Sequence, residues 1–520
     1  MRNASFIRRV LSISLSILMV LVFLPLLLAI LIPIFIYREI IFAVVKFWKW
    51  DEFDSPVAPL GALQVSEDIY QGQGRIHSTA CFLTLRGPVN IAKIRQAFTK
   101  YAVNRRDAKT GKLVNPELQQ NVKYWMGYPF WRHLPGFDIR DVVHMYQNDE
   151  NFTCTEAFVE ELTKKLMFTP FPTNKPLWEA IILPHLVSED GEKTSKFGIL
   201  IRSHHVLSDG FNMFRTFQKM SDKGEEFNFI KPRDYFNGLT VKGPSRLETL
   251  VKWVKFVSRV PSELGEALVD LALNETWDNI HERGIGLKMD LDGSHRAERV
   301  ITKRAQKLQD VSDITKIKNT HGVSGTAVLY SAITGAVRNS IFRQSSQIPH
   351  STFIVTPFPV PSAGEKLENS FTLGYLNVEL ANPDPVSRLL GVHEELEKVK
   401  ASTLPTVVAV CMKLSGCLPR SLVHFIFERS ANSSTIMVSN LAGPKGKSDV
   451  AGHELISYKM SQGGPANATV LGVCMSSIQG KLQITVSADM QTLHSEEVAD
   501  EFLDSFAQEL EYLKKGGKLE

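Results

Sequence analysis

The chain has 520 residues, which is too long for one ordinary hydrophobic core, so we expect at least two domains. Its 59 Lys and Arg residues nearly balance its 55 Asp and Glu residues, without long blocks of one sign, and this argues against a nucleic-acid-binding protein. Hydrophobic (44%) and charged (22%) fractions are ordinary for globular proteins and exclude disorder for most of the chain. Five scattered cysteines without a CxxC pair indicate neither a disulfide framework nor a zinc site.

A long uncharged segment lies near the N-terminus, at residues 10–36. As a straight helix it would extend about 40 Å, against about 30 Å for the hydrocarbon core of a bilayer. It is too long for the apolar part of a signal peptide, and no small-residue cleavage site follows it. We therefore predict a membrane segment, with a kink or break at Pro25 and Pro33.

Residues 38–50 follow with charges confined to one narrow side of a helical wheel, two tryptophans, and apolar residues elsewhere. This pattern is typical of a helix lying among lipid headgroups, and a core helix of the folded body is the alternative. The numbers of positive charges before and after the apolar segment 10–36 are equal, so they do not determine how this segment is oriented across a membrane. A single span and a re-entrant hairpin bent near Pro25, with both ends cytosolic, both fit the sequence.

Strand-like and helical patterns alternate after a Pro-containing linker at residues 51–60. The elements expected first are a strand at 81–85, a helix at 90–101, and strands at 178–183 and 197–202 that form a hairpin with a long loop.

The clearest helix is predicted at residues 245–260, where Ser245 and Glu248 form a capping box and apolar residues recur every three or four positions. A helix bridging two domains and a second membrane contact both fit its pattern of basic and apolar residues. The polar stretch 279–298 is expected to cross into a second domain.

That second domain repeats the mixture of elements, which indicates an α/β or α+β protein. We expect helices at 326–340, 386–399 and 495–513, and strands at 352–356, 435–438 and 482–488. The predicted organisation is a membrane anchor at 1–50, the linker at 51–60, and domains at 61–285 and 286–520.

One motif stands out as chemistry, the HHxxxDG string that contains His204, His205, Asp209 and Gly210. It follows the strand at 197–202, on a connecting loop of the kind that often presents catalytic groups. An imidazole can accept a proton near neutral pH and return it, Asp209 can orient it or brace the loop, and Gly210 is expected to permit a tight turn. A metal pair lacks a third ligand at suitable spacing, and hydrogen-bonded loop histidines without a catalytic role are the remaining alternative.

With these residues the chain resembles the wax ester synthase/diacylglycerol acyltransferase family, within the condensation-domain and chloramphenicol-acetyltransferase-like superfamily. The segment Pro176-Leu177-Trp178-Glu179 is similar to the PLW motif of that family. Ser439-Asn440-Leu441-Ala442-Gly443-Pro444 is similar to its SN-x-x-GP motif in the second half. The order and spacing of the motifs fit from about residue 63 to residue 513.

The resemblance implies two chloramphenicol-acetyltransferase-like α/β domains, with the histidine loop at their interface and a tunnel between them. Acyl-CoA would enter on one side and a long-chain alcohol or diacylglycerol on the other. His205 is expected to be the general base of a direct transfer, which needs no cysteine or serine nucleophile, no metal and no cofactor other than acyl-CoA as co-substrate. Asn440 is the candidate donor to the developing oxyanion, and shaping a turn is the alternative role of its motif.

The expected catalytic residues are His205, His204, Asp209 and Gly210, and the expected substrate-binding residues are Asn440, Trp178, Pro176, Leu177, Ser439 and Gly443. The alternative role for Trp178 is structural packing beside the tunnel. Lipid substrates and the anchor together favour a bilayer partner, at the endoplasmic reticulum with the catalytic domains facing the cytosol, or at lipid droplets. The alternatives are a sterol or another hydroxyl acceptor, a carrier-dependent condensation enzyme, a membrane-tethering protein, and a non-catalytic lipid-binding or transfer protein on the same fold.

Overall fold

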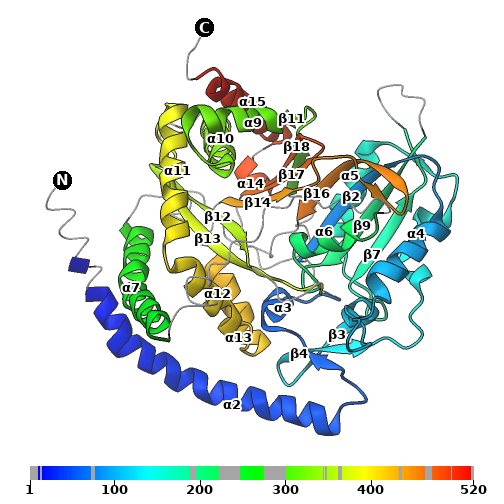
Figure 1. Cartoon of the computed structure of the whole chain (residues 1–520), viewed down its shortest axis with the longest axis horizontal. Coiled ribbons are helices and arrows are strands. Elements are labelled where there is room, and N and C mark those ends of the chain that lie inside the picture. The colour runs from blue at the N-terminus through cyan, green and yellow to red at the C-terminus, as the bar shows by residue number, and fades with distance from the viewer. Residues whose placement is uncertain are drawn as a thin grey trace.

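Two mixed β-sheets with helices packed on them form the body of the protein (Figure 1). The computed structural model describes residues 10–11, 14–71, 77–187, 195–221, 246–273, 300–343, 345, 348–360, 366–431, 436–462, 471–493 and 495–516. The two sheets and their helices confirm the predicted α/β class. A pocket is described beside the histidine loop, and the tunnel stays a prediction.

The first sheet has the strand order β15-β16-β2-β9-β7-β5. Its strands are β15 (Asp449–Val450), β16 (His453–Gln462), β2 (Ser78–Arg86), β9 (Lys196–His204), β7 (Trp178–Leu183) and β5 (Val143–Met145). β7 and β9 pair antiparallel, which confirms the predicted hairpin. Every residue of β2 except Arg86 is buried, because helices cover both faces of this sheet.

The two faces of β2 belong to two different hydrophobic clusters, as strand alternation requires. Cys81, Leu83 and Leu85 pack with α4 (Ile91–Phe98) in the larger cluster. Ala80 and Phe82 pack with α5 (Glu156–Phe168) in the smaller one. Asn90 caps α4 by accepting a hydrogen bond from the N–H of Lys93, so the helix predicted at 90–101 begins where its sequence indicates.

The second sheet has the order β10-β18-β17-β14-β12-β13, and β11 also pairs with β18. Its strands are β10 (Val300–Arg304), β11 (Gln309–Asp310), β12 (Ser351–Pro359), β13 (Phe371–Glu379), β14 (Ile436–Ala442), β17 (Leu471–Ile478) and β18 (Lys481–Asp489). Helices α9 (Val311–His321), α10 (Gly325–Asn339), α11 (Pro385–Ala401) and α15 (Glu496–Lys514) share its core. These elements confirm those predicted for the second half.

One strand pair crosses between the predicted domains. β15 and β16 come from the chain assigned to the second domain, yet β16 pairs antiparallel with β2 at the edge of the first sheet. The expected division into 61–285 and 286–520 is therefore wrong for residues 449–462, while the boundary itself lies outside the described residues. Pairing with β16 satisfies backbone groups that β2 would otherwise expose at an edge, which no local pattern in either segment reveals.

The N-terminal segment is one helix. A π-helical turn at Met19–Phe23 leads directly into α2 (Leu24–Trp48), which contains Pro33 without a break. The re-entrant bend near Pro25, one of the two alternatives for the apolar segment, is therefore wrong. A separate helix at 38–50 is also wrong, because α2 is continuous to Trp48. Pro25 lies in the first turn of α2, and the π turn before it supplies an irregular hydrogen-bond pattern that accommodates a missing N–H. By length and composition, the helix at 14–48 is able to cross a membrane.

One side of α2 packs against the body, which fits the core-helix interpretation for that side. Ile41 and Val45 are buried in a cluster with Phe53, Tyr128 and Phe130. Here the turn between β3 (Gln120–Trp125) and β4 (Tyr128–His133) approaches α2, since Tyr37 donates a hydrogen bond to the carbonyl of Met126 (3.4 Å).

The described chain has further strands and α-helices. They are β1 (Ser55–Pro56), β3 (Gln120–Trp125), β4 (Tyr128–His133), β6 (Thr153–Cys154), β8 (His185–Leu186), α3 (Pro59–Gln64), α6 (Gly210–Gln218), α7 (Arg246–Leu273), α12 (Leu404–Ser415), α13 (Arg420–Ala431) and α14 (Met490–Leu493). α7 extends past Pro261 and is longer than the predicted helix at 245–260, and the expected cap Ser245 lies outside the described residues. The crossover predicted at 279–298 also lies outside them.

Candidate active site

The HHxxxDG motif connects β9 to α6. β9 ends at His204, and α6 begins at Gly210. The backbone N–H of His205 donates to the carbonyl of His77 (2.7 Å), which ties the turn to the start of β2. Gly210 does not have the left-handed conformation that a tight glycine turn would show, so that expectation is corrected. A side chain at this position would instead approach Met460 (3.3 Å) and Leu441 (3.9 Å) from the second half of the chain.

His205 is held by Asn369, a residue that the motif did not predict. The ring Nδ1 lies 3.0 Å from Oδ1 of Asn369, and Nδ2 of the same amide donates to the backbone carbonyl of His205 (2.7 Å). Because Nδ2 faces a carbonyl, Oδ1 is the amide atom that faces the imidazole, and it can only accept. Nδ1 therefore carries the proton, and Nε2 keeps its lone pair.

The imidazole of His205 is set up as a neutral base. Burial lowers its pKa below the ordinary value, and the nearby carboxylate of Asp209 acts in the opposite direction. The net shift is downward, so the ring is neutral near pH 7. Among the described residues, no hydrogen-bond partner occupies Nε2. A neutral ring with one free basic nitrogen can accept a proton from a hydroxyl group.

Asp209 positions the segment that carries Asn369. One carboxylate oxygen accepts from the N–H of Asn212 (2.8 Å), and the other accepts from the N–H of Ser370 (2.6 Å). Asn212 also donates to the carbonyl of Glu368 (2.9 Å). Burial raises the pKa of Asp209, while these donated hydrogen bonds lower it. Within the described part of the chain, no hydrogen bond joins Asp209 to the His205 ring, so its observed role is to join the two halves at the site.

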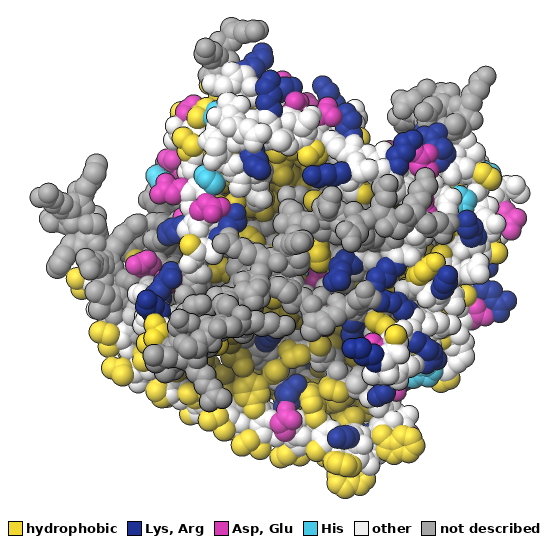
Figure 2. All heavy atoms as spheres, viewed as in Figure 1, with side chains coloured by type: hydrophobic (Ala, Val, Ile, Leu, Met, Phe, Trp, Pro, Cys, Tyr) yellow, Lys and Arg dark blue, Asp and Glu magenta, His cyan; other side chains and the backbone are white. Residues whose placement is uncertain are grey.

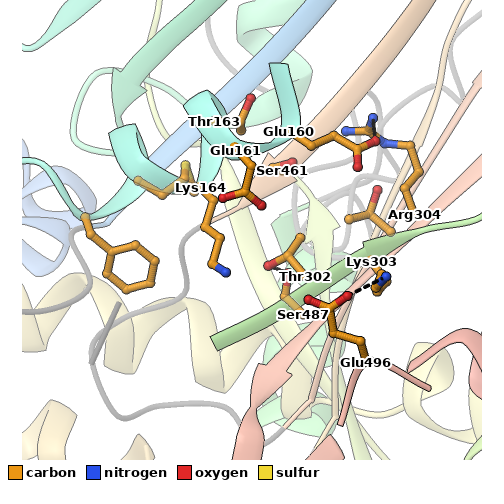
Figure 3. Close-up of a pocket in the computed structure, with 13 residues that line it drawn as sticks. Glu160, Glu161, Thr163, Lys164, Thr302, Lys303, Arg304, Ser461, Ser487 and Glu496 are labelled. Carbon is orange, nitrogen blue, oxygen red and sulfur yellow. Dashed lines mark hydrogen bonds and ion pairs between the residues drawn. The ribbon is translucent and has the colours of Figure 1, made fainter. Parts of the chain in front are cut away.

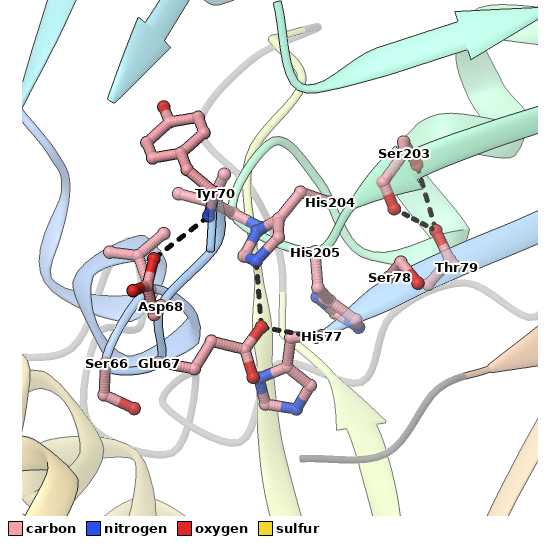
Figure 4. A network of polar contacts seen from close by, with 12 residues as sticks. Ser66, Glu67, Asp68, Tyr70, His77, Ser78, Thr79, Ser203, His204 and His205 are labelled. Carbon is pink, nitrogen blue, oxygen red and sulfur yellow. Dashed lines mark hydrogen bonds and ion pairs between the residues drawn. The ribbon is translucent and has the colours of Figure 1, made fainter. Parts of the chain in front are cut away.

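His204 and His77 form a buried network around Glu67 (Figure 4). The Nδ1 atom of His204 accepts from the N–H of Val206 (3.1 Å), and its Nε2 donates to the Glu67 carboxylate (3.2 Å). The same carboxylate oxygen accepts from the backbone N–H of His77 (2.5 Å). Burial lowers the pKa of His204 to about 3. Both ring nitrogens of His204 are thus used within the fold, and the ring is a positioning element for the loop.

A pocket of about 480 Å³ lies beside the histidine loop. Val206 and Leu207, which directly follow His205, line it together with Asn369 and Phe371. The lining also includes residues 57–61 around α3, Trp131, and Ala409 and Lys413 of α12. The lining combines apolar side chains with a few polar groups, which is the usual composition of a site for an organic ligand.

A second, smaller pocket of about 130 Å³ lies between α5 and the strands β10 and β18 (Figure 3). Its lining is more polar, and its charges pair with each other. Lys303 lies 2.7 Å from Glu496, and Arg304 lies 2.7 Å from Glu160. None of the residues predicted for catalysis or binding lines this pocket.

The PLW motif serves packing. Pro176, Leu177 and Trp178 are buried, and none of them lines either described pocket. The indole N–H of Trp178 donates to the carbonyl of Leu118 (2.9 Å), and its ring stacks on Phe98 with centroids 5.8 Å apart. The carbonyl of Leu177 accepts from the N–H of His204 (2.9 Å). These contacts support the strand that ends in the histidine loop and fit the packing interpretation of Trp178, while the substrate contact stays a prediction.

The SNxxGP motif reaches the same loop from the second sheet. Asn440 is exposed and Ser439 is partly buried near the end of β14. The N–H of Gly443 donates to the carbonyl of Ser477 (2.8 Å). A Cβ at Gly443 would lie only 2.2 Å from that oxygen and 3.6 Å from Phe214 of α6, so only glycine fits there without a shift. β14 therefore ends against α6, next to the histidine loop.

Three contributors were missed from the sequence, namely Glu67, His77 and Asn369. Asn369 is 164 residues from His205 and belongs to a polar Glu-Asn-Ser segment before the strand β13. That polar segment is the only local signal. Its partner could be identified only once the fold had brought the two segments together. Among the described residues, no group of three or more His, Cys, Asp or Glu side chains is arranged to hold a metal ion.

Comparisons with known proteins agree with this architecture. Residues 77–328 match the family model of the wax ester synthase/diacylglycerol acyltransferase catalytic domain, and residues 367–511 match that of the WS/DGAT C-terminal domain. The probable diacylglycerol O-acyltransferase tgs1 of Mycobacterium tuberculosis is 21% identical over 340 residues, which cover 64% of this chain and 70% of that protein.

Two solved structures show the same fold. The wax ester synthase/diacylglycerol acyltransferase from Marinobacter aquaeolei VT8 aligns with 15% identity and a TM-score of 0.54, over 89% of this chain and 100% of that one. The first condensation domain of the calcium-dependent antibiotic synthetase aligns with 11% identity and a TM-score of 0.51, over 88% and 96%. With both halves matched by its family models, the chain belongs to the wax ester synthase/diacylglycerol acyltransferase family and is an acyltransferase.

Proposed function

We propose that this protein is a membrane-bound O-acyltransferase that transfers a fatty acyl group from acyl-CoA to the hydroxyl of a long-chain alcohol or diacylglycerol. The products would be wax esters, triacylglycerol or both. His205 is the general base. The observation that carries this proposal is the hydrogen bond between Nδ1 of His205 and Asn369, since it leaves Nε2 free to accept a proton. Val206, Leu207 and Asn369, which adjoin or contact His205, line a ligand-sized pocket.

The chemistry is a direct transfer. Nε2 of His205 takes the proton of the acceptor hydroxyl as its oxygen attacks the thioester carbonyl of acyl-CoA. The tetrahedral intermediate collapses, its carbon–sulfur bond breaks, and the departing thiolate takes the proton back from Nε2. A positioned base of this kind contributes roughly 10²–10⁴-fold to the rate.

The surroundings of His205 favour the charged imidazolium that exists only during the reaction. Its Nδ1–H donates to Asn369, and a hydrogen bond from a charged donor is stronger than one from a neutral donor. The carboxylate of Asp209 adds an attractive charge interaction. Both interactions strengthen as the proton arrives, which is the condition for lowering the barrier.

Asn440 is the proposed donor to the oxygen that becomes negative in the intermediate. It is exposed near the end of β14, and that strand lies against α6, directly after the histidine loop. An amide N–H pointing at the developing oxyanion typically contributes about 10²–10³-fold. Asp209, His204 and Glu67 are positioning residues in this scheme, because their polar atoms bind the fold itself.

Several features support lipid substrates and a membrane location. The pocket has largely apolar walls, and an apolar helix long enough to cross a bilayer precedes the body. Two of the similar proteins are a probable diacylglycerol O-acyltransferase and a wax ester synthase/diacylglycerol acyltransferase. We therefore propose that the enzyme acts at the endoplasmic reticulum, with its catalytic domains facing the cytosol, and that its product enters lipid droplets.

The test uses microsomes that contain the full chain, His205→Ala, or the control His185→Ala, which changes an exposed histidine of β8. Labelled palmitoyl-CoA is supplied with hexadecanol, diacylglycerol or a sterol, and the lipid products are separated. We expect a new ester with the wild type and the control, and a loss of at least 100-fold in His205→Ala. Equal ester formation in His205→Ala would refute the base. No ester with any acceptor would favour a lipid-binding protein instead.

A further inference from the structure

Four helices that are distant in sequence, α2, α7, α12 and α13, each expose large hydrophobic side chains, and these side chains together are called the apolar face. Large hydrophobic side chains point outward from each of them. Examples are Ile36 (57% exposed), Trp48 (75%), Val254 (59%), Val410 (47%) and Phe425 (56%). Figure 2 shows hydrophobic side chains gathered along the lower edge of the molecule, where Figure 1 places α2. A soluble monomer rarely exposes apolar area on this scale without a partner.

The four helices are joined to one another. At the N-terminal side, Ser16 donates to the carbonyl of Pro261 in α7 (2.7 Å). Glu263 of α7 accepts hydrogen bonds from the N–H and hydroxyl of Thr403, directly before α12 (2.6 and 2.7 Å). Leu31 of α2 packs in one cluster with Val423 of α13. The four helices that carry the apolar face are therefore joined in one part of the folded body.

The way α2 packs determines its direction relative to a bilayer. It contacts the body from Leu31 and Ile34 through Ile41 to Val45, a stretch of roughly 20 Å along the helix axis. If α2 crossed the bilayer upright while keeping these contacts, the charged body beside it would enter the hydrocarbon region, which is very costly. If α2 lies in the plane of the membrane, its outer side contacts lipid while its inner side keeps its contacts with the body.

The C-terminal end of α2 has the side chains that prefer the headgroup layer. Trp48 and Trp50 are largely exposed there, near Lys46. Tryptophan and lysine together are typical of membrane interfaces, because their apolar parts enter the lipid while their polar ends remain in water.

The pocket beside His205 adjoins this face. Leu60 lines the pocket and also packs in the cluster that contains Leu31 and Ile34 of α2. Ala409 and Lys413 of α12 line the same pocket, while Val410 and Leu414 of that helix are exposed on the face. Among the described residues, α3 and α12 thus contact both the pocket and the helices of the apolar face.

We infer that α2, α7, α12 and α13 dock in the plane of a phospholipid bilayer and that the lipid acceptor passes from this bilayer, beside α3 and α12, into the pocket next to His205. The acceptor class is a long-chain lipid with one free hydroxyl. The entry route rests on the proposed function, whereas the docking surface does not. Acyl-CoA, which is water-soluble, is left to enter from the aqueous side.

The first experiment compares the full chain with the double variant Val254→Glu/Phe425→Glu and with the control Leu308→Glu. Leu308 is also exposed (40%), but it precedes β11, which Figure 1 places at the side opposite α2. Each protein is floated with phosphatidylcholine vesicles at limiting lipid. We expect the double variant to bind at least tenfold more weakly, because two large apolar side chains no longer enter the lipid. Unchanged flotation, or loss of a dimer without loss of flotation, would overturn the docking surface.

Ester formation then tests the entry route. With diacylglycerol or hexadecanol in vesicles, the double variant is expected to be at least tenfold slower than the control, and with a short water-soluble alcohol it should equal the control. Equal losses with both acceptors would overturn the route. If the wild type formed no ester at all, the proposed function would fail, while flotation would still decide the docking surface.

A topology measurement avoids changes in the body. Glycosylation tags are placed at the N-terminus or at the C-terminus of the otherwise unchanged chain in microsomes. Docking in the plane predicts that both tags lie on the same side of the membrane and give the same result. Modification of only one tag would show that α2 crosses the bilayer, and this would overturn the in-plane arrangement.

Discussion

Replacing Asn369 by alanine is the sharpest test of the site, because the side chain has two separable functions. Its Oδ1 accepts from Nδ1 of His205 (3.0 Å), and its Nδ2 donates to the carbonyls of His205 (2.7 Å) and Val206 (3.4 Å). The first contact selects the tautomer with a basic Nε2 and stabilises the imidazolium. The other two hold the loop in place.

The expected loss follows from the first contact. A hydrogen bond from a charged donor contributes about 1.5–3 kcal/mol, and it reaches this strength only when His205 is protonated in the transition state. At 1.36 kcal/mol per tenfold change in rate, Asn369→Ala is expected to lower kcat by about 10–100-fold. The loss of the Nδ2 contacts is expected to lower the melting temperature as well, so rates are compared below the onset of unfolding.

The assay is a double-mutant cycle with labelled acyl-CoA and a saturating acceptor, using wild type, Asn369→Ala, His205→Ala and the double variant. If Asn369 acts through the imidazole, it has no effect once the imidazole is gone, and the double variant equals His205→Ala. Asn382→Ala, in the partly exposed turn after β13, removes an amide that bonds Glu379 and the N–H of Asp384, and this control should keep wild-type kcat. An equal 10–100-fold loss in the His205→Ala background would refute the assigned role of Asn369.

Three further predictions concern pH and packing. Burial lowers the pKa of His205, and the neutral ring is the active form in the proposed mechanism. We therefore expect kcat/KM to be retained above the pKa of His205 in the folded protein and lost below it, with a midpoint under 6.5. A midpoint above 6.5 would contradict the assignment of His205 as the base. His204 has a pKa of about 3 in the folded state against about 6.5 in the unfolded state, so the unfolded state binds the proton first as the pH falls. The free energy of unfolding should therefore fall by about 2 kcal/mol between pH 7 and pH 5. Urea unfolding of His204→Gln should show a pH dependence that is smaller by this amount. Gly443→Ala places a Cβ 2.2 Å from the carbonyl oxygen of Ser477 and should lower both the melting temperature and kcat. Gly391→Ala, in α11 with open space around the position, should raise the melting temperature slightly. Similar melting temperatures for the two variants would refute the packing account.

The sequence was informative wherever one segment carries its own signal. Alternating and helical periodicity predicted β2, the hairpin β7–β9 and α15, because these patterns reflect which side of a single element is buried. The HHxxxDG motif identified the loop and its histidines, since those residues are adjacent in the chain. The ordered motifs also led to the family that the comparisons confirm.

The role of each residue was decided only by the tertiary structure. Trp178 carries a motif of the family, yet its indole faces the core, because Leu118 and Phe98 from other segments complete its surroundings. The two adjacent histidines are chemically equal in the sequence. The Glu67 carboxylate and the N–H of Val206 occupy both ring nitrogens of His204, whereas the amide of Asn369 binds only one ring nitrogen of His205.

The same distinction holds for the larger architecture. Uncharged composition alone predicted a membrane segment at residues 10–36, while the contacts of Ile41 and Val45 determine that α2 lies along the body. Strand β16 has the pattern of any buried strand, and its place in the first sheet depends on the free edge of β2. Local sequence determines what an element is, because backbone preference and side-chain periodicity are local. Its partner depends on shape and hydrogen-bonding groups supplied by distant parts of the chain, and these meet only in the folded protein.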